Sequence, residues 1–75
     1  MTAQADTAPA GGRAANALAD AANAAERAAQ ALFQCALAVE RGAPAEVLDP
    51  LHTIAAARIV ALNARLALIA SILQR

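Results

Sequence analysis

The chain of 75 residues has no tryptophan, no tyrosine and no lysine, and it contains one phenylalanine. Nucleobases stack on aromatic side chains and phosphates bind clustered positive charge, so these absences argue against nucleic-acid binding. Six arginines balance six acidic residues and are spread along the chain. The sequence therefore predicts no basic patch for an anionic membrane surface.

Cysteine is equally scarce, because Cys35 is the only one. It has no partner for an internal disulfide, and a four-ligand zinc site would need more ligands than Cys35 and His52 supply. A lone thiol on an apolar helix is typical of a small core residue, and a free thiol fits a reducing cytoplasmic setting. We expect no bound metal and no cofactor.

The first residues of the sequence do not have the pattern of a signal peptide, since residues 1–12 lack both a basic segment and an apolar core. Their small and polar side chains, with proline and glycine, predict a disordered N-terminal tail. The longest apolar run, Ile59–Leu73, is shorter than a membrane span and carries Asn63 and Arg65. We therefore expect a soluble, cytoplasmic protein without membrane insertion.

A hinge at residues 42–49 separates two long segments with helical apolar periodicity. Gly42 can adopt the left-handed conformation that ends a helix. Pro44 cannot continue that helix, because its nitrogen has no proton to donate. Asp49 followed by Pro50 is typical of a helix N-cap with proline at the first helical position.

These signals predict an all-α fold, namely a two-helix antiparallel hairpin with a disordered N-terminal tail. The tail covers residues 1–12 and the hairpin covers residues 13–75. Within the hairpin, we expect the first helix at about 13–41 and the second at about 50–73, with one short turn at Pro44–Leu48 between them, since Pro44 and Pro50 both suit a first helical position.

Each predicted helix has an apolar row at the spacing of helix-to-helix packing. On the first helix we expect the row that faces the second helix to be Leu18, Ala22, Ala25, Ala29, Leu32, Ala36 and Val39. The polar row on its other side is Arg13, Asn16, Asp20, Asn23, Arg27, Gln30 and Gln34. On the second helix the expected inward row is Leu51, Ala55, Ile59, Leu62, Leu66, Ile69 and Leu73.

The second helix has another apolar line on an adjacent face, with two arginines running beside it. A single neighbouring helix can cover either the inward row or this second line, but not both. A domain of this size without a disulfide or a metal also has little hydrophobic core of its own. We therefore expect this line to bind a helical partner. Near the hinge, Phe33 and Leu37 form a further apolar pair, which is either a local core or part of the same partner-facing surface. The candidate partner-binding residues are Ile54, Arg58, Ala61, Arg65, Leu68, Ile72, Phe33 and Leu37.

No arrangement of catalytic residues is apparent in the sequence. His52 has Thr53 beside it, and adjacent residues on a helix point in different directions. Gly11-Gly12 lacks the rest of a phosphate-binding loop. The acidic residues near the hinge would need a cleft, which two helices do not enclose. We predict no catalytic, cofactor-binding or metal-binding residues and expect that the protein is not an enzyme.

Three stretches of the sequence resemble the small co-chaperones of the type III secretion needle subunit, the EscE/YscE/SsaE family. The stretches are Leu32, Cys35 and Val39 at the end of the first helix, the hinge Arg41–Glu46, and Ala61-Leu62, Leu66 and Ile69 on the second helix. The resemblance covers roughly residues 28 to 73. It implies an antiparallel, coiled-coil-like hairpin that forms a heterodimer with a tetratricopeptide-like chaperone. The pair would keep the needle subunit soluble and unpolymerised in the cytoplasm until its transport.

Two alternatives stay open from the sequence. The needle filament subunit is also a short helical hairpin with a proline-containing turn, although this chain lacks tyrosine and its second helix is short for that role. The other alternative is a self-assembling hairpin, a homo-oligomer in which two copies form a four-helix bundle.

Overall fold

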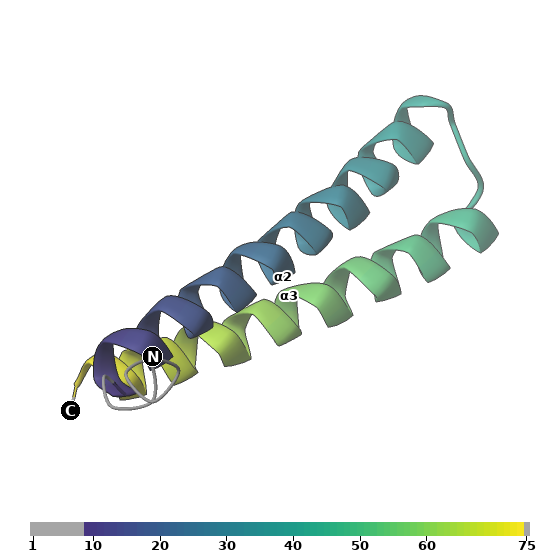
Figure 1. Ribbon diagram of the computed structural model, residues 1–75. Helices are drawn as coiled ribbons and strands as arrows, with labels where there is room; N and C mark the ends of the chain where they lie inside the picture. The colour runs from purple at the N-terminus through teal and green to yellow at the C-terminus, as the bar shows by residue number, and fades with distance from the viewer. Residues whose placement is uncertain (1–8, 75) are drawn as a thin grey trace.

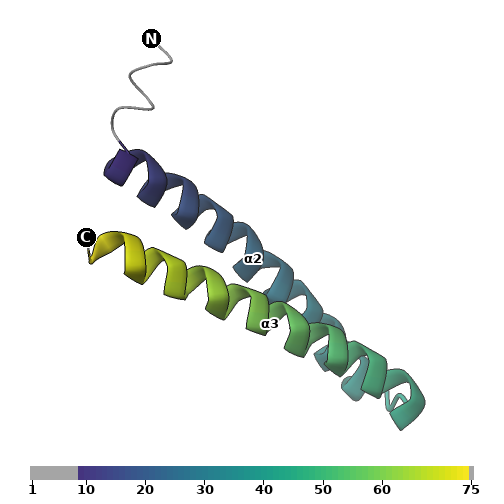
Figure 2. The ribbon, with the colours of Figure 1, turned by 90° about the horizontal axis from the view of Figure 1, so that it is seen from below.

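The computed structural model describes residues 9–74, and this part of the chain forms two α-helices. Helix α2 spans Pro9–Glu40 and helix α3 spans Ala45–Leu73. They run antiparallel and side by side, with the hinge at one end and the start of α2 and the end of α3 at the other (Figures 1 and 2). The predicted all-α hairpin is confirmed.

The first helix begins earlier than the sequence predicted. Residues 9–12 were assigned to the disordered tail but form the first turn of α2. The rest of the predicted tail, residues 1–8, lies outside the described residues.

Helix α2 ends at the hinge in two backbone hydrogen bonds donated by Gly42 and by the residue after it. The Gly42 N–H donates to the Val39 carbonyl and the Ala43 N–H donates to the Ala38 carbonyl, each at 3.0 Å. Gly42 has φ +72°, which is the left-handed conformation that this type of helix end requires. The role predicted for Gly42 is confirmed.

Helix α3 begins at Ala45, so the predicted start at Pro50 is wrong. The Pro44 carbonyl accepts the N–H groups of Val47 at 2.9 Å and Leu48 at 3.1 Å, which forms the first turn ahead of Asp49. Pro50 therefore lies inside the helix rather than at its first position. Its missing N–H removes one hydrogen bond near an exposed helix end, where water can solvate the carbonyl left free.

The surface of α2 that faces α3 is a row of small residues, which we call the alanine seam. Its buried members are Ala21, Ala24 and Ala28, and the same spacing of three and four continues from Ala14 to the half-buried Cys35. The row predicted for this position is exposed instead: Leu18, Leu32 and Val39 have exposed fractions of 53%, 48% and 62%. The predicted inward row of the first helix is therefore wrong.

The inward face of α3 agrees with the sequence prediction along most of its length. Ala55 and Ile69 are buried, and Leu51, Ile59 and Leu62 are half-buried. Leu66 and Leu73 were expected in this row but are exposed. The larger side chains of α3 thus pack on the alanines of α2, which lets the two backbones approach closely.

The hairpin is a single layer of helices. Its principal extents are 54 × 23 × 14 Å, and its radius of gyration of 17.1 Å exceeds the roughly 11 Å of a compact domain of this length. In the described part of the chain no side chain is completely buried, and every residue from Ala31 to Ile54 is half-buried or exposed. Domains usually need a second layer to cover an apolar surface. Both broad faces of this hairpin are open.

Candidate interaction surface

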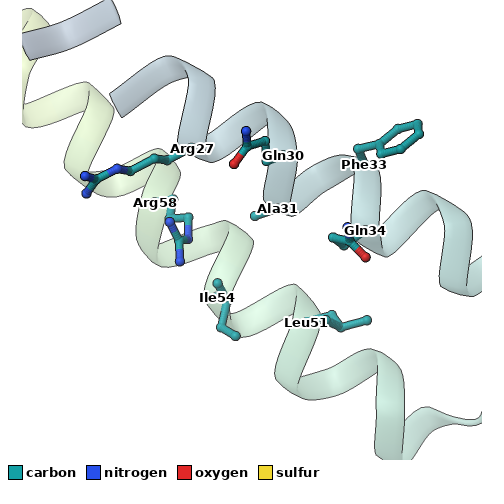
Figure 3. Close-up of a pocket in the computed structure, with 8 residues that line it drawn as sticks. All are labelled: Arg27, Gln30, Ala31, Phe33, Gln34, Leu51, Ile54 and Arg58. Carbon is teal, nitrogen blue, oxygen red and sulfur yellow. The ribbon is translucent and has the colours of Figure 1, made fainter. Parts of the chain in front are cut away.

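One broad face of the hairpin, which we call the polar face, is formed where the polar row of α2 meets one edge of α3. Each residue of the polar row immediately precedes a residue of the alanine seam, so it lies about 100° to one side of it. A groove of about 430 Å³ on this face is lined by Arg27, Gln30, Ala31, Phe33, Gln34, Leu51, Ile54 and Arg58 (Figure 3). A second groove, of about 170 Å³, continues from Arg58 to Arg65 and Asp20. A third, of about 400 Å³, is lined by Arg13, Asn16, Ala17, Asp20, Leu68 and Ile72.

An ion pair joins the two helices across this face. The Arg65 Nε lies 2.9 Å from the Asp20 Oδ2, with both side chains partly exposed. The Nε–H is not aligned with the carboxylate oxygen as a hydrogen bond requires, so the contact is electrostatic. Arg65 also donates from Nη1 to the Ala61 carbonyl at 3.1 Å. These contacts hold Arg65 along the groove rather than in solvent.

The polar face has an excess of positive charge. The grooves are lined by Arg13, Arg27, Arg58 and Arg65 but by a single carboxylate, that of Asp20. The grooves are open and shallow, so they suit the acidic side chains of a partner better than an enclosed small molecule.

The structure places most of the predicted partner-binding residues along the polar face. Ile54, Arg58, Ala61, Arg65 and Leu68 line its grooves. Ile54 and Leu68 are exposed, so their side chains are accessible.

Of the remaining three predicted partner-binding residues, Phe33 and Ile72 also contribute to groove linings, whereas Leu37 does not. Ile72 is buried within the hairpin, so the expectation that the hairpin leaves the whole apolar line uncovered is wrong there. The reason is that Ile72 follows Ile69 by three residues and shares its inward face. Phe33 is exposed and points away from α3 (Figure 3), whereas Leu37 is half-buried.

The opposite broad face, which we call the apolar face, has a different character. On α2 its residues immediately follow those of the alanine seam, so they project about 100° to the other side of the seam from the polar row. Because α3 runs antiparallel, the residues of α3 that immediately follow residues packed against α2, such as Arg65 and Ile72, belong to the same face. The apolar face comprises Leu18, Ala22, Ala25, Ala29, Leu32, Ala36 and Val39 of α2 and Ile59, Leu66 and Leu73 of α3; the same rule adds Ala56, Ala70 and the polar residues His52 and Asn63 at its α3 edge.

The apolar face is open to solvent over most of its length. Leu18, Leu32, Val39, Leu66 and Leu73 are all among the exposed large apolar residues. The prediction from the sequence placed all five of these residues between the two helices, so it did not identify this face as an exposed surface. A contiguous exposed apolar stripe typically marks an interaction site.

Helix α3 is long and apolar enough to cross a membrane, judged by length and composition alone, with a mean hydropathy of 1.7 over its most apolar window. The argument that its apolar run is too short therefore does not hold for the whole helix. Arg58 and Arg65 oppose insertion, because an arginine near the centre of a membrane helix costs about 2.5–3.5 kcal/mol. The absence of membrane insertion stays a prediction.

Comparison of the chain with protein-family models, with curated proteins and with solved structures finds no match. The resemblance to the type III secretion co-chaperones therefore depends on the hinge and helix residues named above. The geometry of the two faces is the independent basis for assigning a function.

Proposed function

We propose that the protein is a small non-enzymatic binding protein that docks a helical protein partner through its apolar face. The observation that supports this proposal is the exposed stripe of leucine and valine side chains beside the alanine seam. Each leucine contributes roughly 1.5–3 kcal/mol when it is fully transferred from water to an apolar contact. Several exposed leucines on one rigid face therefore provide a large favourable term for binding.

The more specific proposal is a cytoplasmic co-chaperone of a type III secretion system. Its partner would be a tetratricopeptide-like chaperone, and together they would keep the needle subunit soluble and unpolymerised. The support for this proposal is the hinge Arg41–Glu46 with its proline-containing turn and the hairpin that it forms. Helical-repeat proteins present extended concave surfaces, and a hairpin 54 Å long and 23 Å wide is a suitable shape for such a surface.

Leu32 and Ile54 form a matched pair for testing which face binds. Ile54 and Ala31, the residue before Leu32, both line the first groove, so Leu32 and Ile54 lie at the same level of the hairpin. Their exposed fractions are similar, 48% and 45%. They differ in that Leu32 lies on the apolar face and Ile54 lies on the polar face.

The experiment is co-expression of the chain with the needle chaperone and needle subunit of the same host, followed by affinity purification. Leu32→Asp is expected to weaken binding at least roughly 10- to 150-fold, which corresponds to the loss of one buried leucine. Ile54→Asp is expected to co-purify like the unmodified chain. If Ile54→Asp abolishes the complex and Leu32→Asp does not, the polar face is the binding surface. If neither chaperone nor needle subunit binds the unmodified chain, the co-chaperone proposal is wrong.

The needle-subunit alternative makes a distinct prediction. A filament subunit would polymerise when it is purified without a chaperone, so electron microscopy of the concentrated chain would show fibres. We expect no fibres, because a filament would need the apolar face to pack on a different surface of the next copy. The polar face opposite it is lined by arginines rather than by a complementary apolar surface.

A further inference from the structure

We propose that a second copy of this chain covers the apolar face when no other partner is bound, giving an antiparallel homodimer with four helices. In this dimer α2 of one copy packs on α2 of the other, with the two hinges at opposite ends. The inference follows from the shape of the apolar face and does not require the type III secretion assignment.

The row of α2 residues on the apolar face is nearly the same when it is followed from either end. It has Leu18, three alanines at 22, 25 and 29, and then Leu32. Under a two-fold axis at Ala25, the alanines of one copy meet the alanines of the other, and each leucine meets the leucine at the far end. Isologous interfaces require this self-complementarity. The small centre permits close approach of the two helices, and the leucines fill both ends.

The size of the face fits a stable dimer. From Leu18 to Val39 the face is about 32 Å long at the rise of an α-helix, and the hairpin is 23 Å wide. The product is about 700 Å² from each copy, which is close to the roughly 800 Å² per partner of a typical stable interface.

The polar face does not suit self-association. Two copies joined through it would bring Arg13, Arg27, Arg58 and Arg65 of one copy towards the same arginines of the other, with only Asp20 to offset them in each. Like charges placed opposite one another cost free energy. The charge distribution therefore directs a second copy to the apolar face.

The homodimer has a consequence for the proposed function, and this step alone rests on that function. The same leucines would contact the second copy and the heterologous partner, so the two complexes exclude each other. The homodimer would protect the apolar face until the partner replaces one copy.

The first test measures the molar mass of the purified full chain by size-exclusion chromatography with light scattering. We expect about twice the 7.5 kDa of one chain for the unmodified protein and for Ile54→Asp, and about 7.5 kDa for Leu32→Asp. Circular dichroism of each variant verifies that the helices persist. A monomeric unmodified chain would overturn the proposal, and so would an Ile54→Asp variant that dissociates while Leu32→Asp stays dimeric.

The second test determines how the two copies are arranged. In a Cys35→Ser background, Ala25→Cys places a thiol on the two-fold axis, where two α2 helices in close contact would allow a disulfide. Ala19→Cys is the matched control, because Ala19 is an exposed alanine of the same helix that points away from the interface. Disulfide dimers of Ala25→Cys but not of Ala19→Cys are expected. Equal crosslinking of both variants, or none for Ala25→Cys, would overturn the antiparallel arrangement.

Both tests use the purified chain alone, so their outcome is separate from that of the co-purification experiment. A monomer that still binds the needle chaperone would refute the homodimer and leave the proposed function standing. A dimer that binds no chaperone would support the homodimer and refute the co-chaperone proposal.

Discussion

The alanine seam is the part of the hairpin that should be most sensitive to added volume. Ala28 is 4% exposed and lies between the backbones of α2 and α3. Leucine at this position, Ala28→Leu, adds three carbon atoms where the helices are in close contact. The helices must separate or shift to accept it. We therefore predict that Ala28→Leu destabilises the fold.

The magnitude follows from the cost of overpacking. Extra methylene groups in a well-packed contact typically cost about 1–3 kcal/mol. Leucine and alanine both favour helices, so their difference in helix propensity contributes only a small part of this. For a domain of this size each kcal/mol shifts the melting temperature by about 4–8 °C. A loss of about 2 kcal/mol would lower the melting temperature by roughly 8–16 °C.

The control is the same substitution on the same helix, Ala36→Leu. Ala36 is exposed on the apolar face, and surface substitutions usually change stability by less than about 0.5 kcal/mol. Thermal unfolding followed by circular dichroism would compare the two variants in a Leu32→Asp background, because association through the apolar face would otherwise contribute to the melting temperature. If Ala36→Leu is the more destabilised variant, the row that includes Ala36 is the true seam and the assignment of the two faces is wrong.

Three further predictions concern single features of the fold. Gly42→Ala should lower the free energy of unfolding by about 1 kcal/mol in a urea titration, because alanine disfavours φ +72° although its Cβ would meet no neighbour. An unchanged urea midpoint would contradict the role of the glycine. Pro50→Ala should raise the free energy of unfolding by about 1–2 kcal/mol in the same titration, since alanine restores an N–H that can donate to the Glu46 carbonyl. A less stable variant would show that the proline suits its position. Asp20→Asn should lower the free energy of unfolding by less than about 1 kcal/mol, and this difference should disappear in high salt, because the ion pair with Arg65 is partly exposed. A larger loss that does not depend on salt would mean that the pair is effectively buried.

The hairpin could be predicted from the sequence because its signals are local. Gly42 and Pro44 end one helix and begin the next through their own backbone chemistry, with no need for distant contacts. The inward row of α3 was also predictable over most of its length, because its large side chains repeat at helical spacing. Local chemistry did not determine the start of α3, where Pro50 is compatible with both a first and a sixth helical position.

The inward row of α2 could not be decided from periodicity. The alanine seam and the row from Leu18 to Val39 both repeat at spacings of three and four, one residue apart. Choosing the row with the larger side chains follows the usual preference for burying leucine. The structure instead pairs small residues on α2 with large ones on α3, a choice that depends on the partner helix and therefore is not contained in the α2 sequence alone. For the same reason the sequence prediction did not identify the apolar face as an open surface, while the predicted partner-binding residues stay a prediction.

The position of the leucines shows where the free energy of burial is available. If stability of the isolated hairpin were the main constraint, Leu18 and Leu32 would gain more by lying in the seam, since a buried leucine contributes more apolar area than a buried alanine. They lie instead on an open face, while the seam contains alanine. The hairpin is therefore weakly stabilised on its own, and contact with another surface adds the burial that the fold leaves unused. Assembly, with a second copy or with a different partner, is then part of what makes this sequence a stable structure.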